Sequence, residues 1–268
     1  MSILNETYIL SNNIMIPKLG LGTWFIDDDK AAQAVRDAVE IGYRNIDTAQ
    51  AYGNERGVGE GIRTAGVARE VLFVSTKLAA EIKDYDAAVA AIEGSLAALD
   101  IGYIDLMLIH APQPWDDFRG GDYSEGNLAA WRALEEAHQV GKIRAIGVSN
   151  FLEPDLENIL DHGTVAPHVN QILVHAGNTP SDLIAYCEEK SILVQAYSPI
   201  AHGEILNNPT VQAIAAKYAV SVPQLCIRYT LQLGTVSLPK TTNPDHMRTN
   251  AEVDFEITTE DMETLRTL

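Results

Sequence analysis

Four residues that can handle protons follow three predicted strands of the chain. Asp47 ends the run YRNID, Tyr52 comes five residues later in IDTAQAYGNE, Lys77 ends VLFVSTK and His110 ends YIDLMLIH. Alone, each is commonly a turn residue, half-buried packing, a solvated strand end or a structural histidine. If the strands lie side by side, however, a carboxylate, a phenol, an ammonium group and an imidazole meet at one rim.

These four groups together suit proton donation to a carbonyl oxygen. Free tyrosine has a pKa of ~10 and is a poor acid at neutral pH, but a nearby lysine favours the phenolate and lowers that pKa. Asp47 would keep Lys77 charged and in place, while His110 could orient the carbonyl oxygen or share the proton. A reduction would also need a cofactor, because no side chain supplies a hydride. A Schiff-base aldolase that uses Lys77 is the alternative.

Eight short β-rich runs alternate with helical patterns and would position these residues. The runs cover residues 19–23, 43–47, 71–77, 103–110, 143–149, 168–172, 192–198 and 235–240, after an expected hairpin of TYIL, SNN and IMIP. This alternation is typical of an α/β fold, the parallel (β/α)8 TIM barrel, whose chemistry lies at the C-terminal strand ends. An open doubly wound sheet also alternates, but the first turn, LGLGTW, lacks the G-x-G-x-x-G run.

Several helices have recognisable signals in the sequence. One apolar stripe contains Val89, Ile92, Leu96 and Leu99, and a second begins with Leu128, Trp131 and Leu134. Helix starts are indicated by Asn54-Glu55, by Ser221 with Pro223, and by Asn243-Pro244. No linker rich in Pro, Gly or Ser interrupts the pattern, so residues 1–268 are expected to form a single domain.

The composition excludes several classes of partner. The 268 residues carry a formal net charge of −18 with dispersed acids, which argues against nucleic acid or an anionic membrane surface. No apolar run approaches the ~20 residues of a membrane span, and the N-terminus lacks a secretory pattern. Cys187 and Cys226 are expected as reduced core residues. These features predict a cytoplasmic protein without a metal site, and a monomer because no segment indicates an obligate interface.

The sequence resembles the aldo-keto reductase family from LGLGTW at residue 19 to the region of Asn250. The motifs that carry the resemblance are GYRNIDTAQAYGNE, STK, LMLIH, IGVSNF, NQI, AYSP and LPKTTNP, in the family's order and approximate spacing. Within the family it is most similar to bacterial reductases of diketogluconate and other small carbonyls. The resemblance implies NAD(P)H-dependent reduction of aldehydes and ketones, including small carbonyls, keto sugars or keto acids. The alternative is a cofactor-binding regulatory subunit without significant turnover.

The resemblance also assigns roles to individual residues. The catalytic tetrad would be Asp47, Tyr52, Lys77 and His110, with Tyr52 as the general acid. Residues that match the family's NADPH contacts are Ser149, Asn150 and Gln171 at the carboxamide, Tyr197 on the nicotinamide ring, Ser198 near the pyrophosphate, Lys240, Thr241 and Thr242 around the 2′-phosphate, and Asn250 at the adenine. Independently, a helix that starts at Asn243-Pro244 would offer free N–H groups to a phosphate.

Three departures from the family pattern affect specificity. His246 stands where an arginine is usual; it is mostly neutral at pH 7 and lacks the bidentate fork, so NADH use is expected to be possible. Ala79 and Ala111 replace tryptophans that many members carry in the substrate pocket, whereas Trp24 is kept and Trp115 is a candidate to refill part of it. The sequence ends at Leu268 without the longer tail of many members, which predicts an open pocket.

Overall fold

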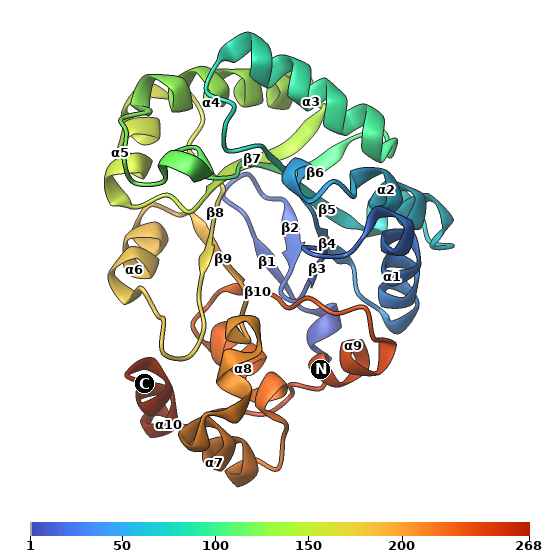
Figure 1. Cartoon of the computed structure of the whole chain (residues 1–268), viewed down its shortest axis with the longest axis vertical. Coiled ribbons are helices and arrows are strands. Elements are labelled where there is room, and N and C mark those ends of the chain that lie inside the picture. Colours follow the sequence, from blue (N-terminus) through green and yellow to red (C-terminus); the bar gives the residue numbers. More distant parts are fainter. Residues whose placement is uncertain (1) are drawn as a thin grey trace.

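The computed structural model describes residues 2–268 and forms a parallel barrel with helices between its strands (Figure 1). Neighbouring strands pair in sequence order from β3 to β10, and bridges from Leu19 to Ser237 and from Gly22 to Lys240 join the first strand to the last. The strands are β3 Leu21–Gly22, β4 Asn45–Asp47, β5 Phe73–Leu78, β6 Ile104–Ile109, β7 Ile143–Ser149, β8 Val169–Leu173, β9 Leu193–Tyr197 and β10 Val236–Leu238. The predicted (β/α)8 barrel is confirmed, and each of the eight predicted runs overlaps one of these strands.

Helices lie between and after the strands, and those that begin at Glu55, Val222 and Pro244 start at the signals identified in the sequence. The helices are α1 Asp28–Ile41, α2 Glu55–Thr64, α3 Tyr85–Leu99, α4 Ser124–Gln139, α5 Glu153–His162, α6 Ser181–Glu189, α7 Pro209–Lys217, α8 Val222–Gln232, α9 Pro244–Asn250 and α10 Thr259–Arg266. Ser221 and Asn243 cap α8 and α9 by accepting a backbone N–H. In the α3 stripe, Ile92 and Leu99 are buried, but Val89 is 36% exposed because it lies at the margin of the buried face.

Within residues 2–268, no helix is both long and apolar enough to cross a membrane. Cys187 and Cys226 are buried and free, as expected. Burial raises the pKa of the two thiols to about 11 and about 12 respectively, so both stay protonated at neutral pH.

The predicted N-terminal hairpin is confirmed and covers one end of the barrel. Strands β1 Thr7–Ile9 and β2 Met15–Pro17 pair antiparallel, and Leu10 and Ile16 pack into an apolar cluster that includes Phe73 and Val169. Phe73 and Val169 are the first residues of β5 and β8. The hairpin therefore lies over the N-terminal ends of the strands, where it is seen inside the ring in Figure 1. The C-terminal ends therefore form the open side.

Helix α2 lies unusually close to its neighbours because it contains three glycines that face them. A Cβ atom on Gly57 would lie 2.0 Å from the carbonyl oxygen of Asp28, and one on Gly59 would lie 1.9 Å from that of Leu99. A Cβ on Gly61 would lie 2.7 Å from the side chain of Val35. Helix α2 thus fits against α1 and the end of α3 only without side chains at these positions. The 3₁₀ turn Gln50–Tyr52 (η2) directly precedes this helix.

Asn54 precedes α2 as predicted, but its side chain does not cap the helix. Its Nδ2 donates to the carbonyl oxygens of Thr23 and Ile26, both at 2.9 Å, and its Oδ1 accepts from Oγ1 of Thr48 at 2.6 Å. Asn54 has no exposed surface. It therefore ties the loop after β3 to the loop after β4, which carries Tyr52.

Candidate active site

Lys77 connects three of the four residues singled out at the strand ends. Its Nζ donates to Oδ2 of Asp47 at 2.6 Å, to the carbonyl oxygen of Thr48 at 2.8 Å and to the phenol oxygen of Tyr52 at 3.3 Å. Strands β4 and β5 are adjacent, and Asp47 pairs in register with Ser75, two residues before Lys77. Lys77 has no exposed surface, and such a buried charge persists only when it is paired and hydrogen-bonded.

The surroundings of Lys77 keep its ammonium group charged. Burial by itself lowers the pKa of a lysine, because it penalises the charged form. Asp47 and Tyr52 more than offset that effect, and the pKa of Lys77 is raised above its ordinary value. Lys77 is therefore a fixed positive charge beside the phenol.

Burial raises the pKa of Tyr52 above its ordinary value of 10.0, and Asp47 adds to the increase. The positive charge of Lys77 acts in the opposite direction but does not cancel it. The sequence-based expectation of a lowered pKa is therefore only partly right, because it included the lysine and left out desolvation. Tyr52 stays protonated at neutral pH, and its O–H is free to donate since its oxygen accepts from Lys77.

His110 stands beside Tyr52 and is neutral. The two ring centroids are 5.7 Å apart with the rings at 73°, and Trp115 also packs edge-on against His110, with ring centroids 5.3 Å apart. Burial and the charge of Lys77 lower the pKa of His110 to about 3. Its Nδ1 is buried without a hydrogen-bond partner among residues 2–268. A neutral imidazole has one N–H donor and one acceptor nitrogen, so the ring can bind a ligand without giving up a proton.

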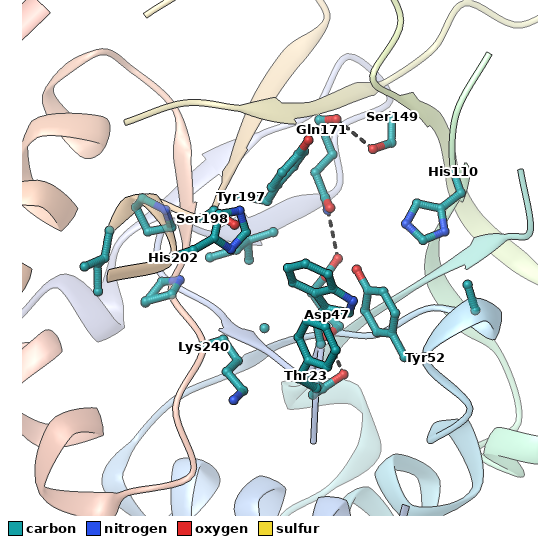
Figure 2. A pocket seen from close by; sticks show the side chains of 18 of the residues that line it. Thr23, Asp47, Tyr52, His110, Ser149, Gln171, Tyr197, Ser198, His202 and Lys240 are labelled. Atoms are coloured by element: carbon teal, nitrogen blue, oxygen red, sulfur yellow. Dashed lines mark hydrogen bonds between the residues drawn. The ribbon is translucent and has the colours of Figure 1, made fainter. Parts of the chain in front are cut away.

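A cavity of about 1070 Å³ opens above these residues (Figure 2). Its wall contains residues predicted for the tetrad and residues predicted to contact the cofactor. The predicted site residues that line it are Trp24, Asp47, Tyr52, His110, Trp115, Ser149, Asn150, Gln171, Tyr197, Ser198 and Lys240. Lys77 is buried and does not line the cavity. Its Nζ contacts the hydroxyl of Tyr52, which does line it.

The other predicted site residues lie outside the wall of this cavity. The methyl group of Ala111 is buried, and its carbonyl oxygen accepts from Lys83 Nζ at 2.8 Å. The backbone N–H of Ala79 donates to Gln50 at 2.9 Å. Trp115, which the sequence suggested as a replacement for the missing tryptophans, does line the cavity. Four cofactor candidates, namely Thr241, Thr242, His246 and Asn250, lie beyond Lys240 on the segment that contains α9.

Asn150 organises the polar wall next to His110. It has a positive φ of 61°, which is uncommon for a residue other than glycine. Its Nδ2 donates to the carbonyl oxygen of His110 and to Oγ of Ser149, both at 3.1 Å, and its Oδ1 accepts from the Tyr197 hydroxyl at 2.8 Å. These bonds bring together side chains from the ends of β7 and β9 that the sequence predicted as cofactor contacts.

Gln171 joins this wall to the ion pair. Its side-chain Nε2 donates to Oδ1 of Asp47 at 2.8 Å and to Oε1 of Gln195 at 2.9 Å. Its backbone carbonyl oxygen accepts from Ser149 Oγ at 2.8 Å. Figure 2 shows Gln171 between Asp47 and Ser149. Gln195 was missed by the sequence analysis. The available signal was a polar residue within the otherwise apolar run ILVQAYS.

The segment after β10 supplies a cation and a helix N-terminus. Lys240 lines the cavity, and Asn243 accepts the N–H of Asp245 at 2.9 Å to cap α9. His246 is exposed on this helix, while Arg248 pairs with Asp245 at 2.9 Å. Arg248 is thus engaged with the first turn of its own helix.

Known proteins resemble this chain along almost all of its length. The model of the Aldo/keto reductase family matches residues 18–268. Glyoxal reductase from Bacillus subtilis (strain 168) is 40% identical over 267 residues, which are 99% of this chain and 93% of that protein. The crystal structure of an aldo/keto reductase from Brucella melitensis superposes with a TM-score of 0.90 at 35% identity, covering 97% of this chain and 98% of the other. An aldo-keto reductase from Bombyx mori in complex with NADP gives 0.88 at 36% identity, with 97% and 92% covered.

Proposed function

The chain belongs to the aldo/keto reductase family, and from this premise we propose that it reduces aldehydes and ketones to alcohols with Tyr52 as the proton donor. The observation that carries the proposal is the contact of buried, charged Lys77 with the Tyr52 hydroxyl at 3.3 Å, beside neutral His110. A bound nicotinamide cofactor would supply the hydride. Residues 1–268 would act as a single domain, as a monomer in the cytoplasm.

Each residue of the tetrad has a distinct task in this proposal. Tyr52 donates its proton to the carbonyl oxygen while the carbonyl carbon gains the hydride, and Lys77 stabilises the phenolate that remains. Asp47 holds Lys77 in place and keeps it charged. His110 donates a hydrogen bond to the same carbonyl oxygen and remains neutral throughout. In the reverse direction, the Tyr52 phenolate accepts the proton of the alcohol.

We propose NADPH as the cofactor, with NADH as a possible substitute. The cavity exceeds what a small carbonyl needs, since typical ligand pockets measure about 300–1,000 Å³, and it extends from His110 to Lys240. A relative of similar structure was crystallised with NADP. The contacts would be made by Ser149, Asn150, Gln171, Tyr197, Ser198, Lys240, Thr241, Thr242, His246 and Asn250.

We propose small carbonyl compounds as the first substrates to test. A relative with 40% identity is a glyoxal reductase, and Trp24 and Trp115 provide apolar walls near Tyr52 and His110. The panel should contain glyoxal, methylglyoxal, glyceraldehyde and a diketo sugar acid. Loss of nicotinamide absorbance measures turnover. Tight NADPH binding without turnover on the whole panel would instead indicate a regulatory subunit.

The role of Tyr52 is tested by removing its hydroxyl group. Tyr52→Phe is expected to keep the NADPH dissociation constant and to lose ~10²–10⁴-fold in kcat, the usual contribution of a general acid. Tyr186→Phe is a matched control, because the Tyr186 hydroxyl is buried without a hydrogen-bond partner in the described chain. This control should keep the wild-type kcat. If Tyr52→Phe also turns over at the wild-type rate, Tyr52 is not the acid.

Cofactor preference depends on the residue at position 246. We expect a ratio of kcat/KM with NADPH to that with NADH below ~1,000, because the imidazole of His246 lacks the two parallel N–H donors with which arginine pairs with a phosphate. His246→Arg should raise this ratio by about tenfold through KM for NADPH. Arg248→Lys, at the residue that pairs with Asp245, is the control and should leave the ratio unchanged. A wild-type ratio well above ~1,000 would contradict the proposal.

A further inference from the structure

Gln195 is a fully buried polar residue that the proposed chemistry does not use directly. It lies on β9 in register with Gln171 on β8 and Val236 on β10, and it has no exposed surface. The interior of such barrels is filled mainly by branched apolar side chains. A buried glutamine there requires a reason, since an unpaired polar group is costly to bury.

The only hydrogen bond of the Gln195 side chain in the described structure is the one that its Oε1 accepts from Nε2 of Gln171 at 2.9 Å. Its own Nε2 is buried without a partner among residues 2–268. Leaving half of an amide unpaired is unfavourable. What Gln195 contributes is therefore an acceptor placed beside Gln171.

The hydrogen bonds of the Gln171 side chain define how its amide group is oriented. The Asp47 carboxylate can only accept, so Gln171 must present its NH₂ group to Oδ1 of Asp47 at 2.8 Å. The second N–H of the same group donates to Gln195. Both donors of Gln171 are thus used inside the barrel. Because Gln171 lines the cavity, its Oε1 is the amide atom that remains for a ligand.

We propose that Gln195 is a positioning residue that, together with Asp47, holds Gln171 with its amide oxygen towards the cofactor. This inference rests on the proposed function, in which Gln171 contacts the nicotinamide carboxamide. Held in this way, Gln171 accepts a hydrogen bond from the carboxamide NH₂ group. The ring can then bind in one of its two flipped orientations, because the opposite flip would place the carboxamide oxygen against the oxygen of Gln171.

The test replaces Gln195 with methionine, which keeps the length of the side chain and removes the acceptor. Gln195→Met should weaken NADPH binding about fivefold, the effect of losing one hydrogen bond, as measured by titration calorimetry. Binding of 2′-phospho-ADP-ribose, which lacks the nicotinamide, should stay within twofold of the wild type. A purely structural role would weaken both ligands equally, and that result would overturn the proposal.

A double-mutant cycle shows whether Gln195 acts through Gln171. In a Gln171→Ala background, Gln195→Met should not weaken NADPH binding further, because the group that it positions is absent. Additive effects would overturn the proposal, as would wild-type affinity in the single variant. Gln195→Leu also removes the acceptor and serves if Gln195→Met does not fold. Failure of the wild-type protein to bind NADPH would instead contradict the proposed function.

Discussion

Tyr52 is surrounded by groups whose charges cancel. Asp47 and Lys77 form a buried ion pair at 2.6 Å, and His110 is neutral because burial and Lys77 lower its pKa to about 3. The phenol is therefore the group in this cluster that can release a proton at neutral pH and leave a charge stabilised by a neighbour. Because the Tyr52 oxygen accepts a hydrogen bond from Lys77, the phenol proton must be donated to a group other than Lys77.

The pH dependence of turnover follows from these pKa shifts. In the proposed mechanism, reduction needs protonated Tyr52, whose pKa is raised by burial, so kcat/KM should stay constant through pH 5–8 and fall only above ~10. Alcohol oxidation needs the phenolate and should rise over the same alkaline range. His110 should add no inflection near its ordinary pKa. An inflection near pH 6.5 that disappears in His110→Gln would contradict the neutral state assigned to this residue.

Residue types at and just after strand ends were sufficient to predict that Asp47, Tyr52, Lys77 and His110 lie together, but not the electrostatics of this cluster. Asp47, Lys77 and His110 could be recognised because each ends a strand-like run. The raised pKa of Tyr52 could not be predicted, because desolvation depends on how the surrounding loops pack. Gln195 was missed for a related reason. Its partner Gln171 is 24 residues away, and only the register between β8 and β9 shows that they meet.

Among the elements, strands and helix starts were easier to predict than the loops between them. The barrel strands are almost wholly buried, and each predicted run contains apolar residues such as LMLI in β6, the pattern expected of parallel strands. The cap signals at Ser221 and Asn243 act locally and were also found. Asn54 shows the limit of such signals, because its side chain bonds to Thr23, Ile26 and Thr48 instead of to its helix.

Replacing the Asn54 amide with a carboxylate tests this loop connection. Asn54→Asp removes the two N–H donors and places a charge next to the carbonyl oxygens of Thr23 and Ile26, so it should lower the free energy of unfolding by about 3 kcal/mol. Asn208→Asp is the matched control. Asn208 caps α7 by accepting only, and aspartate does this equally well. Denaturant titrations of both variants give the comparison, and equal loss in both would contradict the role of Asn54.

At the scale of the whole molecule, charge should influence which carbonyls are accepted. The chain carries a formal net charge of −18. In the described part of the chain, Lys240 is the one lysine or arginine that lines the cavity, and it lies on the side proposed for the cofactor phosphate. Near Tyr52, the charge of Lys77 is balanced by Asp47. A substrate carboxylate would therefore enter without a matching cation.

We expect neutral carbonyls to be better substrates than anionic ones. In a matched pair, kcat/KM for 4-formylbenzoate should be about tenfold lower than for its methyl ester, because the field of the protein repels the anion. Added salt should reduce the difference, since it screens long-range repulsion. Equal values at low ionic strength would show that an unrecognised cation serves the substrate. This outcome would favour keto acids and sugar acids as substrates.

The three glycines of α2 limit how this protein can be made more stable. Replacing glycine with alanine inside a helix is a common route to higher thermal resistance, worth about 1 kcal/mol where space allows. At Gly57 and Gly59 a methyl group would collide with backbone oxygens about 2 Å away, so the usual improvement would push apart the helices that support the Tyr52 turn. An engineer should start instead at Gly94 in α3, where an added methyl group meets no atom of another part of the described chain within 4 Å.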